Sequence, residues 1–182
     1  MFSNAYAQYA GERADAGQIA DSRSINEEKE IKPLIVGQKV PEDFWTKEHL
    51  IYSGGDTIRQ SLKKYKGKPL VIDFWASWCG SCLNSFSKLE TLKNVLGDQC
   101  NIILINGKYT KDDYSAVEKS YDTVIERHGT STIPSIIQDE YLSQLFPHIG
   151  IPYVVWITKS GMIQSLTRSQ FLTPEAFQHI VN

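Results

Sequence analysis

Apolar and polar positions in the middle of the chain predict a strand, a helix and a second strand in succession. Leu70–Trp75 is a nearly continuous apolar run, interrupted by Asp73, which is typical of a strand covered on both faces. From Cys79 to Leu96, large apolar residues recur every three or four positions and predict a helix. A further buried strand is predicted over Ile102–Ile105. This order predicts a βαβ unit with parallel strands and a right-handed crossover.

The second half of the chain continues the alternation. A stripe of apolar residues predicts a helix over Lys111–His128, and a strand over Tyr153–Ile157 precedes a hairpin partner over Met162–Thr167. The apolar pair at 136–137 is too short to assign. Two shorter helices are expected, one within Asp139–Phe146 and one that begins at Thr173.

The segments before residue 70 are less regular. Pro33–Val40 is apolar and β-branched, which favours a short strand or an extended lead-in, and Asp56 is expected to cap a short helix over Thr57–Tyr65. Residues 1–32 are rich in small and charged residues, with six acidic and four basic side chains between positions 12 and 32. Such a segment buries too little apolar surface to offset its ordering entropy. We therefore predict a flexible lead-in over residues 1–32 and one folded domain over residues 33–182.

Composition narrows the class of protein. The 182 residues are 41% hydrophobic and 22% charged, which is enough apolar material for a folded core. Lysine and arginine (19) nearly balance aspartate and glutamate (21), so there is no basic excess for a nucleic-acid backbone. No apolar run reaches the roughly 18 residues of a membrane helix.

One short pattern bears on the compartment. Ala5-Tyr6-Ala7 has the small-x-small form of a signal-peptidase site, which favours export to the cell envelope through a truncated signal. The positive and apolar regions of a secretory signal do not precede it, and such patterns also arise by chance. A cytoplasmic location is therefore the alternative.

The candidate chemistry is a C-x-x-C at the junction between the first predicted strand and its helix. The first turn of a helix carries unsatisfied N–H groups and a positive partial charge, so a thiolate at Cys79 is stabilised. Cys79 is then the attacking sulfur and Cys82, one turn further in, the shielded one. A zinc site would need more ligands, but Cys100 and the four histidines include no second close pair. Cys100 is interpreted as a small buried hydrophobe.

Two segments resemble the thioredoxin superfamily. The residues from Val71 to Cys82, VIDFWASWCGSC, are similar to the thioredoxin active-site segment, and Gly150-Ile151-Pro152 before an apolar strand is similar to its cis-proline loop. The long connection at 107–147 and the extended N-terminal part resemble the TlpA/ResA-like thiol–disulfide oxidoreductases, which are typically exported. The resemblance implies an α/β, thioredoxin-like fold, with a central mixed sheet flanked by helices and an N-terminal extension. It also implies a redox-active Cys79–Cys82 disulfide.

Asp73 matches the buried carboxylate of thioredoxins. An acid within an apolar strand resists ionisation, so its pKa is expected to rise, and the resemblance implies that it accepts the proton of Cys82. The alternative is a structural aspartate paired with a backbone donor. Thioredoxins carry a lysine on the neighbouring strand, whereas Ile102–Ile105 contains none. The effect that this lysine has on the pKa of the acid in thioredoxins is therefore not expected for Asp73.

The resemblance also suggests where a substrate docks. A cis Pro152 would leave the backbone of Ile151 free to pair with a substrate strand beside Cys79. Trp78 would form an apolar lip beside the sulfur. The alternatives are an ordinary trans proline at a strand start and a tryptophan that only packs.

These observations predict a thiol–disulfide oxidoreductase that reduces protein disulfides and needs no cofactor. Its partners would be protein disulfides and an unidentified electron donor, which could be bound to the membrane, and it would act as a monomer. The second hypothesis is a metal-binding or metallochaperone module that uses the same thiols, with His148 as a third ligand. A third, a peroxiredoxin-like peroxidase, lacks its usual threonine three positions before the attacking cysteine, where Ala76 stands.

Overall fold

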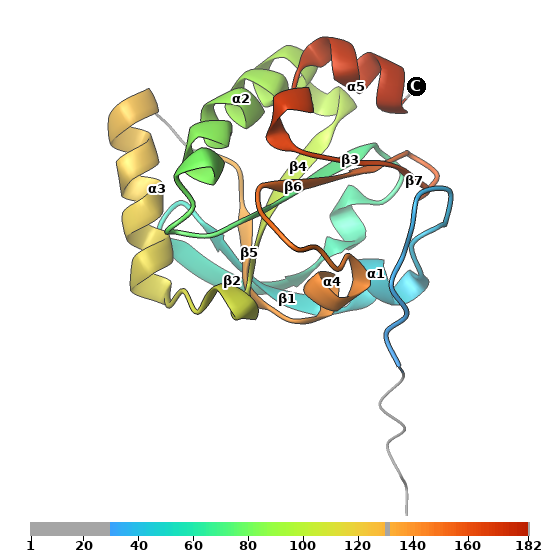
Figure 1. Cartoon of the computed structure of the whole chain (residues 1–182), viewed down its shortest axis with the longest axis horizontal. Coiled ribbons are helices and arrows are strands. Elements are labelled where there is room, and N and C mark those ends of the chain that lie inside the picture. Colours follow the sequence, from blue (N-terminus) through green and yellow to red (C-terminus); the bar gives the residue numbers. More distant parts are fainter. Residues whose placement is uncertain (1–29, 130–131, 182) are drawn as a thin grey trace, which may run out of the picture. The chain divides into compact units, whose positions relative to one another are not determined.

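A mixed sheet with the strand order β2-β1-β5-β4-β3-β6-β7 organises the part of the chain that the structure describes, residues 30–129 and 132–181 (Figure 1). The computed structural model places these elements in one compact unit, Ile31–Asn182. The strands are β1 (Glu48–Ser53), β2 (Asp56–Ser61), β3 (Leu70–Trp75), β4 (Asn101–Gly107), β5 (Ser135–Asp139), β6 (Tyr153–Ile157) and β7 (Ile163–Thr167).

Helices cover both faces of the sheet. One face packs against α2 (Gly80–Leu96), α3 (Tyr114–His128) and α5 (Pro174–Val181), and the other against α1 (Glu42–Thr46), α4 (Tyr141–Leu145) and the 3₁₀ helix η1 (Leu62–Tyr65). Three further 3₁₀ turns, η2 (Gly97–Gln99), η3 (Lys108–Thr110) and η4 (Ser169–Phe171), follow α2, β4 and β7. Within the described residues, no helix is both long and apolar enough to cross a membrane.

The central strand β3 carries the candidate site at its carboxyl end. It pairs in parallel with β4 and antiparallel with β6, and every one of its residues is buried. A strand covered by neighbours and by helices on both faces must be apolar almost throughout, which explains its continuous hydrophobic run. The predicted βαβ unit and the predicted α/β architecture, a central mixed sheet flanked by helices, are confirmed.

The predicted helix over Thr57–Tyr65 is wrong. Residues Asp56–Ser61 form strand β2, which pairs antiparallel with β1, and only the last four residues of the predicted helix form a 3₁₀ turn. The cause is the turn between the two strands, where Gly54 and Gly55 adopt φ of 61° and 88°. Consecutive residues with positive φ favour a tight hairpin, and this outweighs the capping tendency of Asp56.

The segment over Pro33–Val40 is a lead-in without a strand, and a turn at Val36 and Gly37 interrupts it. Leu34 donates its N–H to the Leu145 carbonyl at 2.8 Å, Gly37 donates its N–H to the carbonyl of Ile163 in β7 at 2.8 Å, and Lys39 forms an isolated bridge with Met162. The signal-like Ala5-Tyr6-Ala7 and all but the last three positions of the predicted lead-in lie outside the described residues. The division of the chain at residue 32 therefore stays a prediction.

Candidate active site

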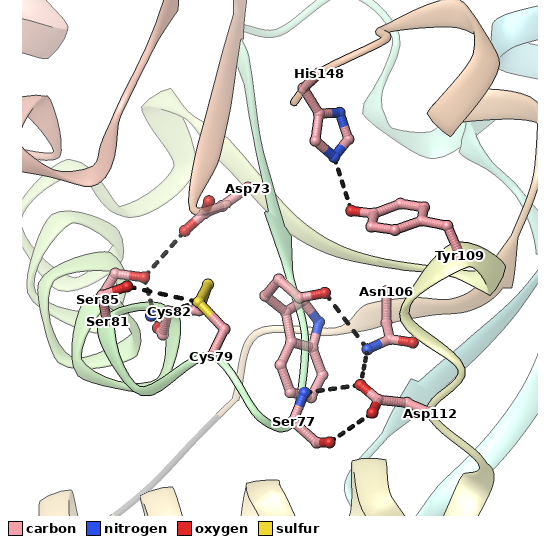
Figure 2. Close-up of a disulfide and its surroundings, with 11 residues drawn as sticks. Asp73, Ser77, Cys79, Ser81, Cys82, Ser85, Asn106, Tyr109, Asp112 and His148 are labelled. Carbon is pink, nitrogen blue, oxygen red and sulfur yellow. Dashed lines mark hydrogen bonds between the residues drawn. A yellow bond between two sulfur atoms is a disulfide. The ribbon is translucent and has the colours of Figure 1, made fainter. Parts of the chain in front are cut away.

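The C-x-x-C lies where β3 passes into α2. Cys79 is the N-cap of α2, and its Sγ accepts a hydrogen bond from the Cys82 N–H at 3.2 Å (Figure 2). The two cysteines are joined by a disulfide. A thiolate at Cys79 would therefore occupy the position where a helix offers an unsatisfied N–H group and a positive partial charge.

The two sulfurs differ in accessibility. Cys79 is 7% exposed and Cys82 is fully buried, while the hydroxyl of Ser81 lies 3.5 Å from the Cys79 sulfur. An incoming disulfide can therefore approach Cys79 but not Cys82. The predicted roles, Cys79 as the attacking sulfur and Cys82 as the shielded one, require this difference in exposure and stay a prediction.

Asp73 is buried on the same side of β3 as the cysteines. Its direct neighbours across the sheet are Leu104 on β4 and Val154 on β6, so the strands beside it supply no charged partner. Burial raises the pKa of Asp73 to about 8, although a hydrogen bond from Ser85 partly opposes this rise. Asp73 therefore holds a proton up to neutral pH and can exchange it near pH 8.

Ser85 connects this acid to the second cysteine. Its hydroxyl lies 3.1 Å from Asp73 Oδ2 and donates to the Cys82 carbonyl oxygen at 2.7 Å, whereas Asp73 Oδ1 has no hydrogen-bond partner among the described residues. The partner of Asp73 is thus a side chain from α2 and not the backbone donor of the structural alternative. The sequence does not reveal this role of Ser85, because small polar residues three positions after a cysteine are common.

A second carboxylate, Asp112, supports the loop before Cys79. It accepts hydrogen bonds from the Ser77 N–H at 2.7 Å, from the Ser77 hydroxyl at 2.5 Å and from the Asn106 amide at 2.7 Å. The Asn106 amide also reaches the Trp75 carbonyl at 3.4 Å. The sequence analysis missed this network, since Ser77 and Asp112 are 35 residues apart and Asp112 lies in a polar turn.

The predicted docking residues surround the same loop. Trp78 is 65% exposed, and its indole N–H donates to the Thr110 carbonyl at 3.1 Å. The Ile151–Pro152 peptide bond is cis, Pro152 is buried, and Ile151 packs against the hydrophobic cluster that contains both cysteines. The fold therefore brings these three residues towards the C-x-x-C from two separate segments.

The remaining candidate ligands have other partners. His148 Nδ1 lies 2.8 Å from the Phe146 carbonyl and Nε2 lies 2.7 Å from the Tyr109 hydroxyl, so both ring nitrogens are engaged. No group of three histidine, cysteine or acidic side chains within the described residues is arranged to hold a metal ion. Cys100 is buried, which raises the pKa of its thiol to about 12.

The sequence matches the Redoxin family over residues 35–172. It is similar to the thioredoxin-like protein YneN of Bacillus subtilis, with 24% identity over 110 residues, which are 59% of this chain and 61% of that protein. The chain thus spans less than two thirds of the length of this relative.

Solved structures share the fold. DsbF from MTB, solved in mixed oxidised and reduced forms, superposes with a TM-score of 0.60 at 16% identity, over 78% of this chain and 99% of that chain. A secreted Mycobacterium tuberculosis disulfide oxidoreductase homologous to E. coli DsbE superposes with a TM-score of 0.55 at 13% identity, over 70% and 87% of the two chains. These likenesses confirm the thioredoxin fold, and the family match covers well over half of the chain. The chain with this C-x-x-C therefore belongs to the Redoxin family.

Proposed function

We propose that this protein is a thiol–disulfide oxidoreductase that acts on protein disulfides through Cys79 and Cys82. The observation that carries the proposal is the position of Cys79, whose sulfur accepts the Cys82 N–H at the start of α2 while Cys82 itself is buried. A stabilised, reachable thiolate beside a shielded second thiol is the arrangement that disulfide exchange requires.

The reaction begins from the dithiol form. The Cys79 thiolate attacks one sulfur of the substrate disulfide, a mixed disulfide forms, and the other substrate sulfur leaves as a thiolate. Cys82 then gives its proton to the ionised form of Asp73, whose share grows as pH approaches the Asp73 pKa of about 8, and attacks the Cys79 sulfur, which releases the second substrate thiolate. Two electrons pass to the substrate, and the protein is left with the Cys79–Cys82 disulfide.

The surface next to Ile151 supports a docking role for the cis-proline loop. A groove of about 750 Å³ adjoins this loop, and its walls include Ile149, Tyr153, Arg168 and Phe171. Ile149 is fully exposed and Phe171 is 47% exposed, so apolar surface is available to a peptide. A substrate strand would bond to the backbone of Ile151 while Cys79 attacks, with Trp78 beside it.

We place the protein in the cell envelope, as a reductant that acts as a monomer. The reductant role needs an acceptor for the Cys82 proton when Cys82 releases the substrate, and Asp73 can supply it. The secreted oxidoreductase with the same fold favours the envelope. An electron donor, which could be bound to the membrane, must return the disulfide to the dithiol form.

Substrate trapping tests the proposal. Cys82→Ala should accumulate mixed disulfides with envelope proteins through Cys79, and the wild-type protein should catalyse insulin reduction by dithiothreitol. Cys100→Ala is the matched control, because it removes a buried thiol with a raised pKa and should neither trap substrates nor lose activity. Insulin reduction no faster than with dithiothreitol alone would overturn the proposal.

A further inference from the structure

Tyr109 and His148 form a contact next to the site that the reaction above does not use. The Tyr109 hydroxyl lies 2.7 Å from His148 Nε2 (Figure 2), and His148 Nδ1 lies 2.8 Å from the Phe146 carbonyl oxygen. Because a carbonyl only accepts, Nδ1 carries the proton and Nε2 accepts from the Tyr109 hydroxyl. The contact is therefore a directed hydrogen bond between η3 and the loop that leads to Pro152.

The imidazole is held on several sides. It stacks on Tyr153 with ring centroids 5.0 Å apart and planes 17° apart, and it lies 4.5 Å from the ring of Phe74. Phe74 is on the central strand next to Asp73, and Tyr153 follows Pro152 directly. His148 thus joins the cis-proline loop to β3 through its ring and to η3 through Nε2.

Tyr109 is fixed by the shape of the chain beneath it. A Cβ atom at Gly107 would collide with the Tyr109 ring and with the Ser143 hydroxyl, so glycine is the residue that lets the ring lie over the end of β4. Tyr109, although 47% exposed, therefore reaches His148 with its ring packed over Gly107.

The same short segment also holds the active-site loop. Thr110 accepts the indole N–H of Trp78 at 3.1 Å, and Asp112 accepts two hydrogen bonds from Ser77. Residues 109–112 consequently bond both to the loop before Cys79 and to the loop before Pro152. Among the described residues, no other segment is hydrogen-bonded to both of these loops.

We propose that Tyr109 and His148 are positioning residues that set the cis-proline loop relative to Cys79, so that a substrate strand on Ile151 presents its disulfide to the sulfur. This inference rests on the proposed function, because it concerns docking of the same protein substrates. Neither side chain takes part in electron or proton transfer. Their effect falls on protein substrates, and a small disulfide that needs no backbone pairing is insensitive to them.

Tyr109→Phe tests this role, since it removes only the hydroxyl. We expect the KM for insulin to rise roughly three- to tenfold, as for the loss of one directed hydrogen bond, with kcat within twofold. The rate with a small aromatic disulfide should not change. Tyr114→Phe is the matched control, because the Tyr114 hydroxyl donates to the Gly55 carbonyl at 2.9 Å, away from both loops.

A double-mutant cycle isolates the bond itself. His148→Phe keeps a ring against Phe74 and Tyr153 but removes the acceptor, so it should raise the KM for insulin as Tyr109→Phe does. The double variant should be no worse than the poorer single variant, because the partners that each single change leaves unpaired are then both absent. Fully additive effects would overturn a joint positioning role.

Hydrogen exchange separates this inference from the proposed function. Tyr109→Phe should speed amide exchange in residues 147–153, whereas Tyr114→Phe should not. Normal insulin kinetics and unchanged exchange in Tyr109→Phe would overturn the inference while the proposed function stands. An equal loss with insulin and the small disulfide would also overturn it, because the effect would then lie in the chemistry. A wild-type protein that reduces no protein disulfide would overturn the proposed function, whatever the exchange data show.

Discussion

Two carboxylates flank the carboxyl end of β3 and have opposite surroundings. Asp73, on the side of the cysteines, has one hydrogen-bond partner for Oδ2 and none among the described residues for Oδ1. Asp112, on the side of the supporting loop, accepts three hydrogen bonds from Ser77 and Asn106. Figure 2 shows the two groups on either side of the strand.

The difference in surroundings gives the two acids different roles: Asp73 can exchange a proton, and Asp112 supports the loop before Cys79. A buried acid with few donors is held in its neutral form, which is why the pKa of Asp73 lies near 8 and its proton can move. A carboxylate that accepts three hydrogen bonds holds its donors in place, and here two of the three come from Ser77 in the loop that ends at Cys79. The chain thus assigns proton exchange and loop geometry to different acids.

Replacing the attacking cysteine should have the largest effect on turnover. Cys79→Ser should reduce insulin turnover about a thousandfold or more, because a hydroxyl does not replace the thiolate as nucleophile. Alkylation of the reduced protein at pH 6 should label Cys79 before Cys82. Preferential labelling of Cys82 would reverse the two roles.

Replacing the reactive acid should have the next largest effect. Asp73→Asn should slow release of the mixed disulfide roughly ten- to hundredfold near pH 8, where about half of Asp73 is ionised, because Cys82 loses its proton acceptor. Attack by Cys79 should be nearly unaffected. Single-turnover kinetics with a labelled peptide disulfide would separate the two steps, and an unchanged release rate would leave Asp73 with a structural role.

Replacing Asp112, the acid that supports the loop, should mainly lower the stability of the protein. Asp112→Ala leaves the donors of Ser77 and Asn106 without their acceptor and should lower the free energy of unfolding by about 2 kcal/mol. It should also slow alkylation of Cys79 by a few fold. Asp113→Ala is the matched control: Asp113 caps α3 by accepting from the Ala116 N–H at 2.8 Å, so its loss should cost about 1 kcal/mol without affecting Cys79.

If Asp112→Ala and Asp113→Ala slow alkylation equally, the effect is one of general stability. Asp112 would then have no particular role in placing the loop. Urea unfolding of the oxidised protein and alkylation of the reduced protein measure the two quantities separately.

The last effect concerns the way in which stability changes with pH. Asp73 has a pKa of about 8 when folded and about 4 when unfolded, so the folded state binds more protons between these values. The stability that this proton contributes is complete below about pH 4 and is lost as pH rises through about 8, with a slope of up to roughly 1.4 kcal/mol per pH unit. In Asp73→Asn this slope should disappear. Urea unfolding from pH 5 to 8.5 would measure it, and identical slopes in both proteins would contradict the raised pKa.

The amino-acid sequence by itself determined the central part of the fold. The strand Leu70–Trp75, the helix that follows Cys79 and the strand within Asn101–Gly107 are visible because elements buried on both faces or along one stripe carry strong apolar periodicity. The pair Cys79–Cys82 and the acid at position 73 also stand out, since each is a chemically distinctive residue within such an element.

Local pattern was insufficient at the edge of the sheet. Strand β2 has mostly exposed or half-buried side chains, so it lacks an apolar repeat that would distinguish it from a polar helix. Its strand conformation depends on the glycine turn and on pairing with β1, which the periodicity of Thr57–Tyr65 does not express.

Only the tertiary structure decided what surrounds the reactive groups. Ser77 meets Asp112 across 35 residues, and Tyr109 meets His148 across 39. These polar residues lie in turns, where single residues carry no periodic signal, and their partners are set by which strand ends meet at one edge of the sheet. The reactive residues could therefore be predicted from local pattern, whereas the contacts that position them depend on chain segments that only folding brings together.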